Sequence, residues 1–184
     1  MKTEQQYYEE AISMKAYMDN MSKLKEESFA IYESFKIPQD EFIKPLKNSD
    51  VHILTITEDW CGDAMLNNPI IRKVAEAAGI EIRAVLRDAD TDLIDRHLTN
   101  GGRSIPVYLL LNEEGEVVAK WGPRAPELQQ LVMTMRAQLP DQEDPNFEQA
   151  QKEMYTKMRS QYVEDSTLWH YVYESFKQTV ALAI

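Results

Sequence analysis

The chain has 184 residues, 43% of them hydrophobic and 28% charged, a balance that is typical of one globular domain and excludes an intrinsically disordered chain. Its 31 acidic and 20 basic residues give a formal net charge of -11, and no stretch of the sequence concentrates Lys and Arg into a basic stripe. Sequence-independent binding to nucleic acid depends on such clusters, so we expect no nucleic-acid partner.

The sequence also disfavours a membrane protein and a disulfide-stabilised protein. The polar N-terminus has no apolar segment of signal-peptide length, and no apolar run reaches the roughly 18 residues of a membrane-spanning helix. Cys61 is the only cysteine, which rules out an internal disulfide and a zinc site made of several cysteines in one chain. We expect no membrane association, no metal, no cofactor and a cytoplasmic protein with a reduced thiol.

Residues 1–50 predict an N-terminal helical extension. In the first 35 residues, apolar side chains recur at helical spacing, namely at Tyr7, Ala11, Met14, Met18 and Met21. A second short helix is predicted over 28–35, ahead of Pro38, and the linker that follows contains a further short helix at 40–46. The apolar stripe needs burial, so we expect the extension to pack on the central domain.

Residues 51–140 predict an α/β domain. Strands are expected over 51–57, 80–86, 106–111 and 116–121, and helices over 61–78, 90–98 and 124–139. The first strand is nearly all apolar, as in a strand that is buried on both faces, and a turn at 112–115 makes a hairpin of the last two. This order predicts a central mixed sheet of about four strands flanked by helices, with parallel strands joined by crossover helices.

A polar break at 140–145 precedes a C-terminal helical extension, residues 141–184. Two helices are predicted there from apolar side chains at helical spacing, the first along Phe147, Gln151, Met154, Met158 and Tyr162. These stripes are expected to pack on the central domain as well. If the chain forms a homodimer, the helical extensions are the expected interface.

Cys61 lies between a buried strand and the start of a helix. The first N–H groups of a helix have no intrahelical partner, and the helix dipole adds positive charge there, so a thiolate at this position is stabilised. Such a thiol has a lowered pKa and raised reactivity. A lone cysteine is otherwise most often a buried structural residue, since free Cys is among the most buried residue types. The junction and the preceding Trp60 favour a reactive cysteine.

Several motifs resemble those of the thioredoxin family. The segment Trp60-Cys61-Gly62-Asp63-Ala64 resembles the thioredoxin active-site motif, Trp-Cys-Gly-Pro-Cys. The other matches are Pro69, the family's helix-kinking proline; Ser104-Ile105-Pro106, its cis-proline loop; Gly122, its glycine after the last strand; and Asp88-Ala89-Asp90, its aspartates after the second strand. The resemblance covers roughly residues 51–139, and the terminal helices fall outside it.

The resemblance implies a thioredoxin-like fold in which Cys61 is the attacking thiol. It also implies a cis peptide bond before Pro106, with Ile105 and Pro106 opposite Cys61, where an extended substrate can pair with the backbone. Pro69 and Gly122 would have structural roles.

Three positions depart from the family pattern. Asp63 replaces the proline, Ala64 replaces the resolving cysteine, and Thr55 stands where thioredoxins have a buried acid that assists proton transfer. A dithiol thioredoxin needs a second thiol to release its product, so this chain can make only the first attack. Asp63 can stabilise the first helical turn, oppose thiolate formation at Cys61, or do both.

Two functions therefore stay open at this point. The first is a monothiol thiol–disulfide oxidoreductase, in which Cys61 attacks a disulfide-bearing protein or a mixed disulfide and an external, low-molecular-weight thiol resolves the intermediate. The second is a redox-inactive thioredoxin-like module that binds a partner protein. Trp60-Cys61-Gly62 favours the first function, and Thr55, Asp63 and Ala64 favour the second.

Overall fold

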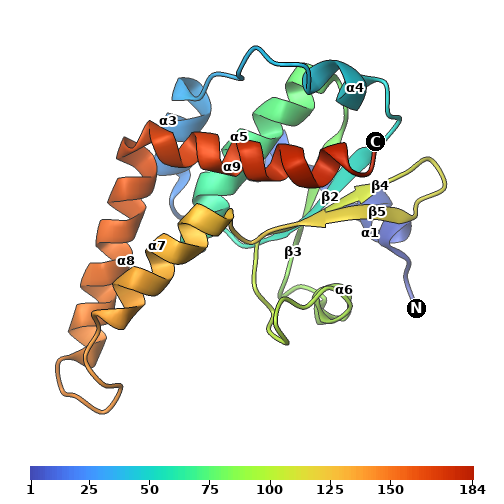
Figure 1. Cartoon of the computed structure of the whole chain (residues 1–184). Helices are drawn as coiled ribbons and strands as arrows, with labels where there is room; N and C mark the ends of the chain where they lie inside the picture. The colour runs from blue at the N-terminus through green and yellow to red at the C-terminus, as the bar shows by residue number, and fades with distance from the viewer.

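The computed structural model describes residues 1–184, which form nine helices and five strands (Figure 1). The strands are β1 (Ile12–Ser13), β2 (His52–Thr57), β3 (Ile82–Leu86), β4 (Val107–Leu111) and β5 (Val117–Trp121). The helices are α1 (Glu4–Glu10), α2 (Met14–Asp19), α3 (Lys25–Ser34), α4 (Ile43–Lys47), α5 (Gly62–Ala78), α6 (Thr91–Asp95), α7 (Pro126–Ala137), α8 (Phe147–Glu164) and α9 (Ser166–Ala181).

The five strands make one mixed sheet in the order β1-β3-β2-β4-β5. β2 lies at the centre, parallel to β3 and antiparallel to β4, and β5 completes a hairpin with β4. The α/β fold class and the four expected strands are confirmed. The fifth strand, β1, comes from the N-terminal extension and pairs with the edge of β3 in antiparallel orientation.

The prediction of helix throughout the first 35 residues is wrong in part. Ala11 ends α1 in an extended conformation, and the two residues of β1 follow it directly. The Ser13 hydroxyl then accepts a hydrogen bond from the Ala16 N–H (3.1 Å), which caps the start of α2. Leu24 interrupts the helical backbone a second time, because its left-handed conformation (φ 58°) lies directly before α3. At Ile12 and Ser13, pairing with the open edge of β3 therefore replaces the helix that the apolar spacing predicts.

The sheet separates two hydrophobic clusters of different size. Successive residues of a strand point to opposite faces, so Ile53 of β2 belongs to one cluster and Leu54 to the other. The larger cluster has 33 buried residues and lies under α5, α2 to α4 and the C-terminal helices, whereas the smaller one has ten and lies under α1 and α6, on the other side of the sheet in Figure 1. This explains why the apolar pattern of β2 is nearly continuous.

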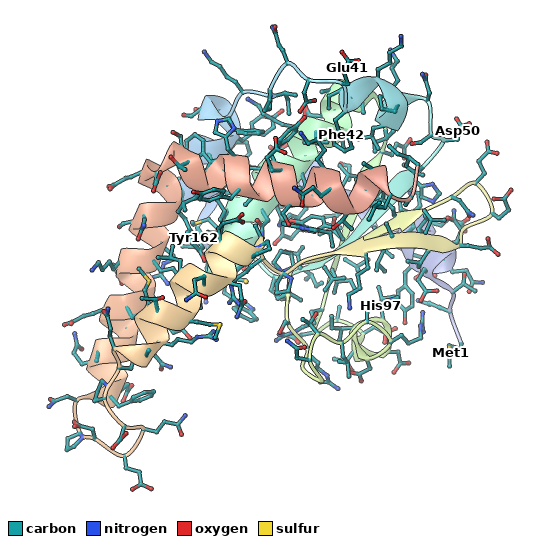
Figure 2. All side chains as sticks on the ribbon, viewed as in Figure 1. Met1, Glu41, Phe42, Asp50, His97 and Tyr162 are labelled. Atoms are coloured by element: carbon teal, nitrogen blue, oxygen red, sulfur yellow. The ribbon has the colours of Figure 1, made fainter.

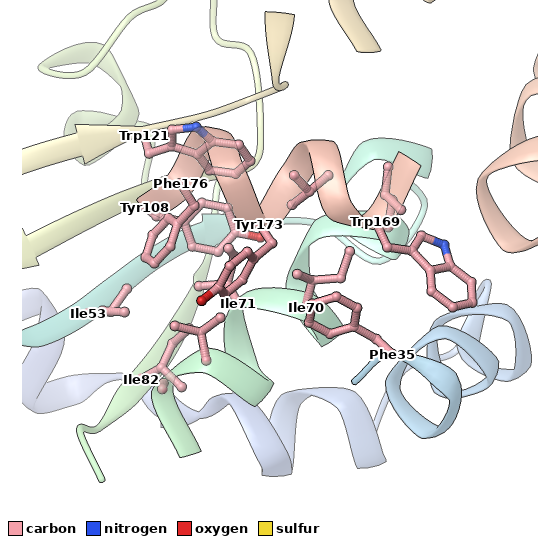
Figure 3. Packing of buried hydrophobic residues seen from close by; sticks show 14 of the residues in the cluster. Phe35, Ile53, Ile70, Ile71, Ile82, Tyr108, Trp121, Trp169, Tyr173 and Phe176 are labelled. Carbon is pink, nitrogen blue, oxygen red and sulfur yellow. The ribbon is translucent and has the colours of Figure 1, made fainter. Parts of the chain in front are cut away.

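Helix α9 contributes to the larger cluster, not to a separate layer. In Figure 3, Phe176 lies with Tyr108 of β4 and Trp121 of β5, and its ring centroid is 5.8 Å from that of Trp121. The Trp121 indole N–H also donates a hydrogen bond to the Ser175 hydroxyl (2.9 Å). Aromatic contacts of this kind are among the strongest in a core, so α9 closes the face of the sheet that α5 covers only in part.

None of the nine helices has the length together with the apolar character that crossing a membrane would demand.

Candidate functional site

Cys61 occupies the N-cap position of α5, in the short connection that follows β2. Its backbone is extended (φ -85°, ψ 123°), and its carbonyl accepts the first helical hydrogen bond from the Met65 N–H (3.0 Å). The side chain is partly buried. The expected position of Cys61, at the start of the helix after the first central strand, is therefore confirmed.

The loop before β4 lies opposite Cys61. The Cys61 Sγ is 3.6 Å from the Ile105 carbonyl oxygen, to which the thiol donates a weak hydrogen bond, and the Ile105–Pro106 peptide bond is cis. Gly122 packs directly against this loop. Its φ is +121°, and a Cβ there would collide with the Pro106 carbonyl oxygen. Only glycine combines that backbone with so close an approach.

The remaining motif residues take different positions around the thiol. Trp60 is 47% exposed, and the Arg87 guanidinium lies 5.1 Å from its ring centroid. Ala64 is almost fully buried in the first turn of α5, and Pro69 lies buried in the middle of that helix. Trp60 is thus available to an incoming molecule, whereas Ala64 and Pro69 are covered by protein.

Burial, and secondly the neighbouring Asp63 carboxylate, raise the pKa of the Cys61 thiol to about 11. The N–H groups of Ala64 and Asp63 and the Arg124 guanidinium act in the opposite direction and do not outweigh the first two effects. The expectation of a lowered pKa at the helix start is therefore wrong. The interpretation of Asp63 as a residue that opposes thiolate formation agrees with this electrostatic balance.

Asp63 is the centre of a buried polar cluster. It is only 6% exposed, and its Oδ2 lies 2.7 Å from Nη2 of Arg124, which precedes α7. The Tyr162 hydroxyl donates a hydrogen bond to the other oxygen, Oδ1 (2.9 Å), from the side of α8 that faces α5 and α7 (Figure 2). Asp63 therefore connects the start of α5 to the C-terminal extension as well as affecting the charge near Cys61.

We predict that Tyr162→Phe lowers the free energy of unfolding by about 1.5–3 kcal/mol, because the buried Asp63 carboxylate loses a hydrogen-bond donor. Urea unfolding measures this loss. Tyr171→Phe is the matched control, since Tyr171 lies on the exposed side of α9 and its substitution should change stability by less than about 0.5 kcal/mol. Equal stability of the two variants would contradict a structural role for this hydrogen bond.

A pocket of about 450 Å³ lies beside Cys61. Ile105 lines it on one side, and Tyr155 and Met158 of α8 line it on the other. Helix α8 lies close to the start of α5, since a Cβ at Gly62 would be 3.3 Å from the Arg159 Cγ and in ordinary contact, at 3.6 Å, with the Met158 Cε. The position of α8 could not be predicted, since its apolar spacing shows that one face is buried but not which surface covers it.

Thr55 and Glu58 complete the surroundings of the connection after β2. Thr55 is fully buried and its hydroxyl has no hydrogen-bond partner, so the sheet provides no acid beneath the cysteine. Glu58 is also buried, its Oε2 has no partner, and burial raises its pKa. It lines a separate pocket of about 650 Å³ between the sheet and the N-terminal helices, which does not include Cys61. Sequence reasoning did not single out Glu58.

Metal-binding residues are not assembled anywhere in the chain. No three or more His, Cys, Asp or Glu side chains lie together in a way that could hold a metal ion. Asp88 pairs with Arg87, and Asp90 caps α6 and accepts a hydrogen bond from the Tyr7 hydroxyl (2.7 Å). The two aspartates after β3 thus have structural partners.

Comparison with known proteins finds a matching family model and solved structures of similar fold. A family model described as thioredoxin matches residues 11–139, which includes most of the N-terminal extension. No curated protein matches the chain. The crystal structure of an HIV epitope scaffold is similar over 100% of both chains, with a TM-score of 0.68 and 14% identity.

A protein of unknown function from Pseudomonas aeruginosa is similar over 95% of this chain and 99% of its own, with a TM-score of 0.60 and 14% identity. At such identities the likeness shows the fold alone, and it extends over the terminal helices. The family match covers well over half of the chain and includes both Cys61 and the Ile105–Pro106 loop. The chain is therefore a member of the thioredoxin family.

Proposed function

We propose that the protein is a monothiol thiol–disulfide oxidoreductase with Cys61 as its catalytic residue. The observation that carries the proposal is the placement of the Cys61 thiol, 3.6 Å from the Ile105 carbonyl oxygen and open to a pocket of about 450 Å³. A disulfide in that pocket would lie against the thiol. An extended substrate would pair with the backbone of Ile105 and Pro106, and the exposed Trp60 would contact it.

The reaction consists of two exchanges. In the first, the Cys61 thiolate attacks one sulfur of a disulfide R–S–S–R′, which breaks the S–S bond, forms Cys61–S–S–R and releases R′–S⁻, which takes up a proton. In the second, an external thiolate attacks the R sulfur, which forms a new disulfide with R and restores the Cys61 thiolate. Each exchange breaks one S–S bond and forms one, so no further oxidant or reductant is needed.

The raised pKa of Cys61 slows the first exchange without preventing it. The best attacking thiol has a pKa near the ambient pH. A thiol with a pKa near 11 is ionised far less, but its thiolate is more nucleophilic. Its rate of attack at neutral pH is therefore only about a hundredfold below that of the best thiol. A thiolate of high pKa is also a poor leaving group, which slows the second exchange. Since Ala64 offers no second thiol, the mixed disulfide should persist until an external thiol arrives.

A second candidate is a redox-inactive module that binds a partner protein. The observation that favours it is the same pKa of about 11, because very little Cys61 is ionised at neutral pH. The Ile105–Pro106 loop and the pocket would then bind a partner without chemistry. In either case a single unpaired thiol suits a reducing compartment, and we place the protein in the cytoplasm. A homodimer through the helical extensions stays a prediction.

The test is formation of a mixed disulfide with an excess of 2-hydroxyethyl disulfide, followed by intact-protein mass. The wild type should gain one adduct that added small thiol removes, and Cys61→Ser should gain none. Ala64→Cys should release the small thiol without an external one, because a second sulfur can then attack the adduct. If Cys61 can be alkylated at alkaline pH yet forms no adduct over hours, the binding module is the better account.

A further inference from the structure

The pocket beside Cys61 is positively charged, in contrast to the rest of the protein. The chain has a net charge of -11, yet Asp63 is the only acid among the residues that line this pocket. Four arginines line it, from four different places in the fold: Arg87 after β3, Arg124 before α7, Arg136 at the end of α7 and Arg159 in α8. Chain segments far apart in sequence therefore bring positive charge to one place.

Two of these arginines have carboxylate partners and two do not. Arg124 pairs with Asp63, and Arg87 pairs with Asp88, whose Oδ1 lies 2.9 Å from its Nε. Neither Arg136 nor Arg159 has an acidic group within ion-pair distance or any hydrogen bond from its side chain. The pocket thus has about two uncompensated positive charges.

Arg159 is held close to the thiol by its aliphatic part. A Cβ at Gly62, the residue after Cys61, would lie 3.3 Å from the Arg159 Cγ, so the side chain lies directly over the start of α5. Arg159 remains partly exposed and is one of the residues that line the pocket. Long basic side chains commonly pack in this way, with the aliphatic segment against the protein and the charged group in solvent.

Building on the proposed function, we propose that Cys61 exchanges with a small disulfide that has carboxylate groups, and that Arg136 and Arg159 bind these carboxylates. A guanidinium binds a carboxylate through two parallel hydrogen bonds, which makes Arg the usual residue for this recognition. A pocket of about 450 Å³ is within the size range of small-molecule sites. The carboxylates take no part in the exchange, whose atoms balance as above.

The test uses three small disulfides that differ in the charge of their ends: 3,3′-dithiodipropionate (anionic), 2-hydroxyethyl disulfide (neutral) and cystamine (cationic). We expect the adduct with Cys61 to form at least about tenfold faster with the anion than with the cation at low ionic strength. High salt should reduce this preference, because it screens charges separated by more than a few ångströms.

The double variant Arg136→Gln/Arg159→Gln should slow the anionic disulfide and reduce the anion-to-cation ratio to near one. Lys44→Gln/Lys47→Gln is the matched control, because it changes the net charge equally on the exposed side of α4, and it should keep the wild-type ratio. A wild-type ratio near one, or a ratio that the arginine variant leaves unchanged, would overturn the inference and leave the proposed function standing.

Failure of the proposed function gives a different result. If none of the three disulfides forms an adduct, thiol–disulfide exchange is wrong, and the charge preference is then read from alkylation. Iodoacetate and iodoacetamide are similar in size and differ in charge, so a faster reaction with iodoacetate that the arginine variant removes would still support an anionic ligand. Equal loss of both reactions in that variant would count against it. Much faster exchange with a disulfide-bonded peptide of no net charge would show that the substrate is a protein.

Discussion

Alkylation of Cys61 by iodoacetamide is expected to accelerate about tenfold for each pH unit from pH 7 to pH 10, because only the thiolate reacts. Burial and the Asp63 carboxylate raise the thiol pKa to about 11, so the thiol is protonated below that pH. About one molecule in ten thousand then has a thiolate at pH 7, and this fraction increases about tenfold per pH unit until the pH approaches the pKa. The rate should therefore not level off below pH 10.

A surface thiol provides the comparison. Ser160 lies on the exposed side of α8, and a cysteine placed there in the Cys61→Ser background should give a rate that levels off near pH 8.5. Asp63→Asn in the wild-type background should bring the levelling of Cys61 to lower pH, because it removes one of the two causes of the shift. A wild-type profile that levels off below pH 9 would show that Cys61 is more exposed than the structure has it.

Asp63→Ala is expected to lower the free energy of unfolding by about 3–5 kcal/mol, because it leaves the Arg124 guanidinium buried without its counter-charge. The Arg124 side chain is only 15% exposed, and its Nε has no partner even in the wild type, so solvent can replace little of the lost interaction. Tyr162 also loses the acceptor for its hydroxyl. Urea unfolding, with the far-UV circular dichroism of each variant as a check on folding, measures the loss.

The double variant Asp63→Ala/Arg124→Met separates the uncompensated charge from the packing change. Removing both partners should restore part of the stability. The sum of the losses in Asp63→Ala and Arg124→Met should therefore exceed the loss in the double variant by more than about 1 kcal/mol. Additive losses, or an Asp63→Ala loss below about 1 kcal/mol, would mean that water reaches Arg124 freely. Asp63→Ala should also lower the pKa of Cys61, which the pH profile of alkylation measures separately from stability.

The central domain could be predicted because its signals are local. The apolar, β-branched run of β2 and the helical spacing of α5 each specify their own structure, and Trp60-Cys61-Gly62 marks the junction between them. β1 could not be predicted, because two residues contain no periodicity and its formation depends on the open edge of β3. A local pattern gives an element, whereas pairing at an edge depends on the whole sheet.

The surroundings of the thiol could not be predicted for a similar reason. Asp63 and Tyr162 are 99 residues apart, and nothing in either neighbourhood indicates that a carboxylate and a hydroxyl will meet. The pKa of Cys61 depends mainly on burial, and the thiol is buried against the smaller hydrophobic cluster, to which distant segments such as Ile56 and Ile105 contribute. The positive charge of the pocket likewise depends on the packing of a distant segment, because Arg159 belongs to α8.

The position of α8 has a consequence for the order in which the site is completed during synthesis. The ribosome makes the chain from its N-terminus, so the residues of the family match, 11–139, emerge before α8 and α9. Until those helices dock, Gly62 at the start of α5 lacks its cover and Asp63 lacks the Tyr162 hydroxyl. The pocket beside Cys61 is therefore completed late, because Tyr155, Met158 and Arg159 of its lining are made after the whole of the central sheet.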